Sequence, residues 1–198
     1  YFYLAEAYHI SGNIDSSGDV SGVAKITDST ANDGTLTLSG ADTQEINVQI
    51  GESGTGEEFG TINISNKDGV TFNNNIYADT LAINKNSKLN IKLSNIADTT
   101  NNGQKISVNN LILKTGSIIN LDYSNISNIS DSYNIIVDVD GGVKNENGND
   151  ISDKLLSNIK LQSNLKSKLL KSLLSYNADE DIIILSTKRD QEILNKFN

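Results

Sequence analysis

Short stretches of alternating apolar and polar residues run through most of this 198-residue chain. Leu36 and Leu38 belong to one such stretch, and Ile46, Val48 and Ile50 belong to the next. Successive side chains of a strand point to opposite faces, so this pattern predicts short strands that bury one face. The pattern is weaker before residue 34, where Gly, Ser and Asp separate single apolar residues.

Pairs of apolar residues recur at a spacing of eight positions. The pairs are Leu38 and Ile46, Ile64 and Phe72, Ile83 and Ile91, and Leu113 and Leu121. They define four units that begin near residues 36, 62, 81 and 111, so the units are 26, 19 and 30 residues apart. A constant spacing within units and a variable distance between them are expected where stacked strands keep their register and corner loops vary in length.

Two neighbouring units are near-copies of each other. The stretch Asn75–Ile96 aligns with Lys105–Ile126 at a shift of 30 positions, so that Leu81 meets Leu111. Self-similarity at such a period is typical of stacked repeats. We therefore expect an all-β solenoid. An antiparallel β-sandwich also uses short alternating strands, but it does not by itself produce tandem near-copies.

The last quarter of the chain has a different period. From Asp150 to Ser175, Leu and Ile recur at spacings of three and four, with Lys residues between them. This pattern predicts an amphipathic helical segment near residues 150–175, in two pieces. Its apolar face could cover an open end or flank of the solenoid, or its basic face could lie on an anionic membrane. We expect a final strand over Asp181–Ser186.

These patterns divide the chain into three parts. We expect an N-terminal cap or irregular rungs over residues 1–30 and solenoid rungs over residues 31–149. The helical segment, the final strand and the C-terminal tail occupy residues 150–198. Asn is frequent at the predicted corners, for example Asn66, Asn73 and Asn86, because it tolerates left-handed backbone and bonds to its own turn. We expect these residues to form turns rather than to bind a ligand.

Composition narrows the classes of function. A formal net charge of −9 argues against general nucleic-acid binding, which needs a basic surface. The chain has no Cys, so it forms no disulfide and offers no thiolate for a zinc site. It has no run of about 18 apolar residues, so we expect no transmembrane helix. Since Met is absent even at position 1, we expect a piece of a longer product.

The segment Asp138–Asp150 is rich in oxygen ligands and could suggest a calcium site. An EF-hand loop needs Gly at its sixth position and Glu at its twelfth, and counting from Asp138 these positions hold Val143 and Asn149. The tandem nine-residue calcium repeat of β-rolls is not found in the sequence either. We therefore expect a solvated turn and no metal site.

Three further groups are candidates for catalysis. Glu57 and Glu58, and the run Asp179–Asp181, are carboxylate clusters, but a glycosidase needs two carboxylates across a cleft. His9 is the single His, and no GxSxG motif accompanies it. We therefore predict no catalytic residue, no cofactor-binding residue and no cofactor, and we expect that the protein is not an enzyme.

The repeat units resemble those of bacterial autotransporter passenger domains. Gly60–Ile91 is similar to right-handed β-helix rungs, most of all to those of large rickettsial surface antigens of the outer-membrane-protein-B type. Gly12–Gly22 is similar in style, and Ser175–Asp190 resembles the last strands of a passenger. The resemblance implies a right-handed parallel β-helix, secretion through the outer membrane, and adhesion or coat formation. The Leu- and Lys-rich segment near residues 150–175 departs from the plain rung pattern.

We therefore expect a structural protein that acts outside the cell, on a bacterial cell surface, in adhesion or in a surface coat. Its expected partner is a receptor on a host or neighbouring cell, and self-association is also open. One alternative is a carbohydrate-active β-helix of the lyase or tailspike type. That function requires acids on successive rungs, whereas the predicted outward positions carry mostly Asn, Ser and Lys. Another alternative is a self-assembling surface-layer or fibre subunit joined by end-to-end strand pairing.

Overall fold

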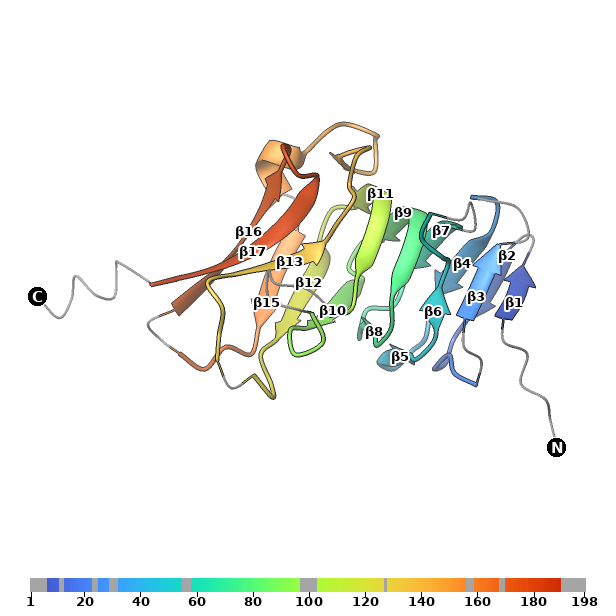
Figure 1. Cartoon of the computed structure of the whole chain (residues 1–198), viewed down its shortest axis with the longest axis horizontal. Helices are drawn as coiled ribbons and strands as arrows, with labels where there is room; N and C mark the ends of the chain where they lie inside the picture. The colour runs from blue at the N-terminus through green and yellow to red at the C-terminus, as the bar shows by residue number, and fades with distance from the viewer. Residues whose placement is uncertain are drawn as a thin grey trace, which may run out of the picture.

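Figure 1 shows the computed structural model, which describes residues 7–10, 13–22, 25–28, 32–54, 58–96, 103–126, 128–155, 159–167 and 170–189. The described segments form strands in three sheets, and a short 3-10 helix, η1 (Ser152–Lys154), lies beside them. Two sheets are parallel, and their strands stack along the long axis of the molecule (Figure 1). The third sheet is antiparallel and lies towards the C-terminal end. The prediction of an all-β chain is confirmed for the described residues.

The first sheet contains nine strands, and every pair in it is parallel. The main path across it runs through β1 (Ala7–Ile10), β3 (Lys25–Asp28), β6 (Gln49–Ile50), β9 (Ile76–Ile83), β7 (Phe59–Ile64), β4 (Thr35–Leu38) and β2 (Asn13–Ser16). Off this path, β11 (Ile106–Leu113) pairs with β9 and with β14 (Val143–Lys144). The long strand β9 joins two rows of strands, because its first half pairs with β6 and its second half pairs with β7.

The second sheet contains five parallel strands. Their order is β15 (Ile159–Ser163), β12 (Ser117–Asp122), β10 (Lys88–Lys92), β8 (Val70–Phe72) and β5 (Gln44–Ile46). From β7 to β12, strands alternate between the two parallel sheets: β7, β9 and β11 belong to the first, and β8, β10 and β12 belong to the second. Over this part of the chain, each return to a sheet places the new strand one position further along it.

The strand register confirms the predicted repeat. Leu36, Ile62, Leu81 and Leu111 are aligned in turn on four neighbouring strands, so the four unit starts lie in one row. All aligned pairs between β9 and β11, and between β10 and β12, are 30 positions apart. These parallel ladders do not fit the antiparallel sandwich that the alternation alone allowed.

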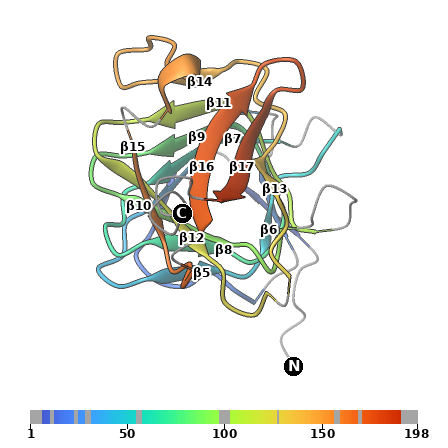
Figure 2. The same cartoon turned by 90° about the vertical axis from the view of Figure 1, so that its left-hand side faces the viewer.

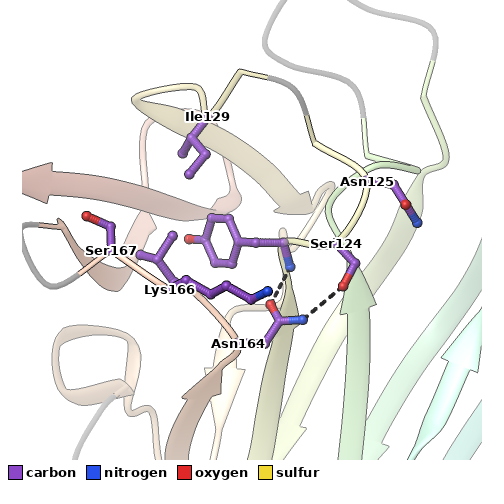
Figure 3. A pocket seen from close by; sticks show the side chains of 8 residues that line it. Ser124, Asn125, Ile129, Asn164, Lys166 and Ser167 are labelled. Atoms are coloured by element: carbon purple, nitrogen blue, oxygen red, sulfur yellow. Dashed lines mark hydrogen bonds between the residues drawn. The ribbon is translucent and has the colours of Figure 1, made fainter.

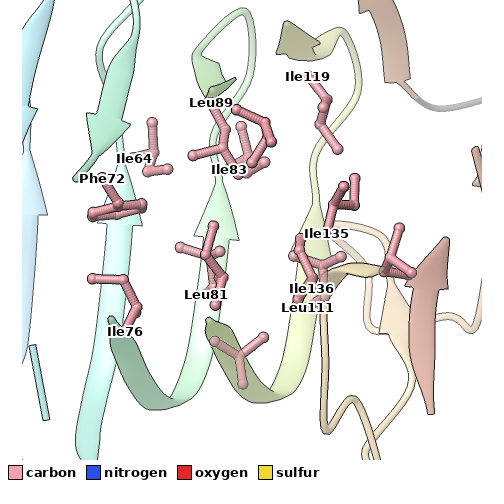
Figure 4. Close-up of a cluster of buried hydrophobic side chains, with 14 of the residues drawn as sticks. Ile64, Phe72, Ile76, Leu81, Ile83, Leu89, Leu111, Ile119, Ile135 and Ile136 are labelled. Atoms are coloured by element: carbon pink, nitrogen blue, oxygen red, sulfur yellow. The ribbon is translucent and has the colours of Figure 1, made fainter. Parts of the chain in front are cut away.

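Aliphatic side chains from the two parallel sheets meet in one continuous core (Figure 4). Ile62, Leu81 and Leu111 from the first sheet and Leu89 from the second are fully buried. Their neighbours along each strand alternate with them and are more exposed, as in β4, β10 and β12. A strand that buries every second residue is locked in register, since a slip by one residue would expose the whole apolar set.

Asn residues shape the corners between the sheets, as predicted. Asn66 is fully buried; its Oδ1 accepts hydrogen bonds from the backbone N–H groups of Asp68 and Gly69, and its Nδ2 donates to the carbonyl of Asp42 at 2.7 Å. Asn86 adopts a left-handed backbone with φ of 59°. Asn tolerates this conformation better than most residues because its short polar side chain bonds to nearby backbone.

The prediction of a helical segment near residues 150–175 is wrong. This part of the chain holds η1 and β15, and it ends within β16 (Leu170–Asn177). β16 pairs along its whole length with β17 (Ile182–Arg189), and Leu161 of β15 extends the ladder that contains Ile119. Pairing with distant strands overrides a local spacing of three and four, because strand preference depends on packing against neighbours. The strand expected over Asp181–Ser186 is confirmed as part of β17.

The antiparallel sheet consists of β13 (Ser132–Ile136), β17 and β16, in that order. One face of it packs on the parallel strands through Leu174, Ile183 and Leu185, which are buried. On the same face, the hydroxyl of Tyr123 shares hydrogen bonds with Ser172 Oγ at 2.9 Å and Thr187 Oγ1 at 3.3 Å. In Figure 2, β16 and β17 lie in front of the parallel strands, so this sheet covers one end of the stack.

Replacing Leu81 by Ala should lower the free energy of unfolding by about 2–5 kcal/mol, because it leaves a cavity beside Ile62 and Leu111. Thr61→Ala is the matched control, since Thr61 lies on the outward side of β7 and is only partly buried. We expect it to cost less than about 1 kcal/mol. Urea denaturation of both variants measures the difference. Equal losses would contradict the burial pattern.

Candidate functional site

The segment Asp138–Asp150 forms turns, and several of its side-chain oxygens accept hydrogen bonds from the local backbone. Asn145 Oδ1 accepts hydrogen bonds from the N–H groups of Asn147 and Asn149, and Asp150 Oδ1 accepts one from Ser152. Within the described residues, no group of three or more His, Cys, Asp or Glu side chains is placed to hold a metal ion. Some of the oxygen atoms that make this segment a calcium candidate cap turns, and others accept hydrogen bonds from a neighbouring segment, as Asp138 does from Ser107 and Glu146 from Thr115.

The other candidate residues belong to different elements of the fold. The run Asp179–Asp181 lies in the turn between β16 and β17, and Glu58 lies next to β7. His9 belongs to β1, but its side chain lies outside the described part of the structure, as does the whole of Glu57. The structure therefore places the two described carboxylate groups on different elements, and it does not bring them together as a pair.

A row of bonded polar side chains follows the outward face of the second parallel sheet. Asn73 Nδ2 donates to Asn47 Oδ1 at 2.7 Å, and Lys92 Nζ donates to Asn73 Oδ1 at 3.1 Å. Lys92 also forms an ion pair with Glu45 at 3.0 Å. One step further, Asn120 Nδ2 donates to Asn90 Oδ1 at 3.0 Å. The sequence predicts Asn73 as a turn former, but its side chain links neighbouring strands.

Asp122 extends this row towards the C-terminal end. Asn164 Nδ2 donates to Asp122 Oδ1 at 2.6 Å, and the backbone N–H of Ser124 donates to the same oxygen at 2.8 Å. Partial burial tends to raise the pKa of Asp122, but the hydrogen bonds from Ser124 and Asn164 and the charge of Lys92 outweigh it. The pKa of Asp122 is therefore lower than its ordinary value.

Four carboxylate residues gather in a shallow groove of about 420 Å³ beside the first sheet. The acids are Glu58, Asp79, Asp138 and Asp140. Three of them already have partners: Asn109 Nδ2 donates to Asp79 at 3.0 Å, the hydroxyl of Ser107 donates to Asp138 at 2.5 Å, and the backbone N–H of Gly54 donates to Glu58 at 3.3 Å. Carboxylates in an open groove can bind cations or the hydroxyl groups of a saccharide. Of these acids, sequence patterns indicate Glu58 and the segment that begins at Asp138, and they miss Asp79.

The 30-residue repeat contains a signal for one part of this groove. It aligns Asp79 with Asn109, which are hydrogen-bonded to each other in the structure. The remaining acids come from corners of irregular length, where the repeat gives no register. Only the three-dimensional structure therefore shows that these acids lie in the groove.

A second hollow, of about 340 Å³, lies near the C-terminal end of the second sheet (Figure 3). Its lining residues are Tyr123, Ser124, Asn125, Ile129, Asn164, Leu165, Lys166 and Ser167. Ile129 is 38% exposed, which is more than any other large apolar side chain among the described residues. The side chain of Asn164 is already bonded to the backbone N–H of Tyr123 and to Asp122 and Ser124. This hollow offers apolar contact and one cation, Lys166.

Asp122→Asn should lower the free energy of unfolding at pH 7 and have little effect near pH 2. A carboxylate whose folded-state pKa is lowered stabilises the fold above its unfolded pKa, and this contribution is lost as the pH falls through the folded pKa. Asn164→Ala removes one donor to the same carboxylate but also the bonds to Tyr123 and Ser124, so part of its loss should persist near pH 2. Denaturation at several pH values tests this. A loss that does not change with pH would contradict it.

Comparison of the chain with protein-family models, with curated proteins and with solved structures finds no match. No helix among the described residues has the length and apolar character needed to cross a membrane. The geometry of the described residues is therefore the basis for a functional proposal.

Proposed function

We propose that this chain is a structural cell-surface protein of the autotransporter-passenger type, built on a right-handed parallel β-helix, and that it acts in adhesion or in a surface coat. Two observations support the β-helix. From β7 to β12 the chain alternates between two parallel sheets and advances by one strand at each return. It also keeps a 30-residue register over the best-defined turn. The right-handed sense follows the strong preference of parallel crossover connections.

One observation carries the proposed role. The outward faces of the parallel strands carry short polar side chains that bond to each other from strand to strand, as in the row from Asn47 to Lys92. Such a surface is held rigid by its own hydrogen bonds above a continuous aliphatic core. A rigid, polar stack of strands suits the display of a binding surface on a cell. A receptor on a host or neighbouring cell is the proposed partner, and the bacterial cell surface is the proposed location.

A second function, cleavage of a polysaccharide, is favoured by the acidic groove. Glycoside hydrolysis uses a pair of carboxylates, and the groove contains Glu58, Asp79, Asp138 and Asp140. In the adhesion proposal these acids bind saccharide hydroxyls and break no bond. The two functions therefore differ in whether a product is released.

The test combines a binding assay and a product assay with a panel of cell-surface and microbial polysaccharides and with whole cells. The adhesion proposal predicts binding without new reducing ends or unsaturated products. On the adhesion proposal, the wild type and the double variant Asp79→Asn with Asp138→Asn should both give only the background product signal. Product release by the wild type that this variant reduces at least tenfold would establish the cleavage function instead. The absence of binding to any cell or polysaccharide would contradict adhesion.

A further inference from the structure

The antiparallel sheet has an outward face that points away from the parallel strands. Leu174 and Leu185 are aligned partners and are buried towards the core. Because side chains alternate along a strand, their neighbours Leu173 and Ile184 lie on the opposite, outward face. Ile182, two positions before Ile184 on β17, lies on this face as well.

This outward face carries three aliphatic residues among polar ones, since Ser132, Asn134, Ser175, Asn177 and Ser186 share it. Leu173, Ile182 and Ile184 each remain partly exposed. An antiparallel sheet with one face on the core normally carries polar residues on the other face. Neighbouring aliphatic side chains on such a face indicate a contact surface.

One end of the face is basic. Lys171 of β16 and Lys188 of β17 are directly aligned, and both are exposed. Like charges placed directly opposite each other on two strands destabilise the pair. Within the described part of the chain, the ion pairs are Lys25–Glu52 and Lys92–Glu45, so neither of these lysines pairs with a described carboxylate. A negative partner would remove this repulsion.

The other end of the face is acidic. The turn between β16 and β17 carries Asp179 and Glu180, which are both exposed. Asn177 lies on the outward face because it is separated from Leu173 by four positions. Its Nδ2 donates to Glu180 Oε2 at 2.8 Å and holds this carboxylate near the outward side.

We propose that a second copy of this chain docks on this face, with the two faces related by a two-fold axis. A two-fold contact must be self-complementary, and this face is basic at one end and acidic at the other, with three aliphatic side chains among short polar ones between them. The rotation places Lys171 and Lys188 of one copy opposite Asp179 and Glu180 of the other. Leu173, Ile182 and Ile184 then pack against the same residues of the partner copy.

A second copy fits this face better than a polyanion does. A polyanion would neutralise the lysines, but it would be repelled by the acidic turn and would leave the aliphatic side chains without contact. The net charge of −9 opposes association through most other surfaces and favours the one face with a compensating pattern. The dimer does not depend on whether the parallel sheets bind a cell or a polysaccharide.

The face is small, so the dimer should be weak. Eight residues of β16 span about 27 Å, and three strands span about 14 Å. The contact is therefore smaller than the roughly 1,200–2,000 Å² of a standard stable interface. We expect monomer and dimer to exchange. A two-fold contact closes on itself, so this face gives dimers and not fibres.

Sedimentation velocity over a hundredfold range of concentration, up to about 1 mM, tests the dimer directly. The sedimentation coefficient should rise from the monomer value towards the dimer value. A coefficient that stays at the monomer value across this range would overturn the proposal. Continued growth beyond the dimer would also overturn it.

Charge-swapped variants test the orientation. Lys171→Glu with Lys188→Glu makes both ends of the face acidic, and Asp179→Lys with Glu180→Lys makes both ends basic. Each variant alone should remain monomeric, and an equimolar mixture should form a heterodimer tighter than the wild-type dimer by at least tenfold. Lys85→Glu with Lys105→Glu changes the net charge as the first variant does but lies elsewhere, and it should still dimerise. A mixture that stays monomeric while the wild type dimerises would reject the two-fold arrangement.

A third variant tests the apolar centre. Ile184→Thr keeps a β-branched residue on the central strand but removes apolar surface, and it should weaken the dimer at least tenfold. Ile112→Thr is the matched control, because Ile112 is a partly buried residue on the outward side of β11. It should leave the dimer unchanged. Circular dichroism verifies that each variant is folded. A folded Ile184→Thr protein that dimerises like the wild type would show that the contact lies on another surface.

Discussion

The alignment of parallel strands is the constraint on which the rest of the structure depends. Strands such as β10 and β12 bury every second residue, and each buried residue must meet the buried residue of the next strand. Leu81 can lie on Leu111 only if the intervening chain leaves the first sheet, crosses the second and returns after 30 residues. The corners must therefore absorb all variation in length. This explains why polar insertions occur at corners and why apolar spacing within a unit does not change.

The same constraint determines what the surface can offer. Outward side chains on neighbouring parallel strands are held at a spacing of about 4.8 Å, so short polar residues bond to their equivalents one strand away. The result is a set of polar rows that are largely satisfied within the protein, such as Asn90 and Asn120. Groups that remain available to a partner lie beside corners and at the covered end. The acidic groove is an example of the first, and the outward face of the antiparallel sheet is an example of the second.

Much of the parallel stack could be predicted from the sequence, because its signal repeats. The near-copies at residues 75–96 and 105–126 are enough to define the register between their strands. The segment near residues 150–175 misleads the prediction, because Leu at spacings of three and four is compatible with a helix when read locally. Its strands are determined by partners that lie far away in the sequence, such as Leu185 for Leu174. The acidic groove escapes prediction for the same reason, since Asp79 and Asp138 are distant in the sequence and are brought together by stacking alone.

A disulfide trap tests the parallel register most directly, because the chain has no Cys of its own. Asn90 and Asn120 are aligned on neighbouring strands, and their side chains are in contact at 3.0 Å. Cysteines at these two positions should form an intramolecular disulfide under mild oxidation, since neighbouring strands lie within the range that a disulfide spans. Cysteines at positions 90 and 162, which are two strands apart, should not. If the second pair cross-links as readily as the first, or the first does not cross-link at all, the stacked register is incorrect.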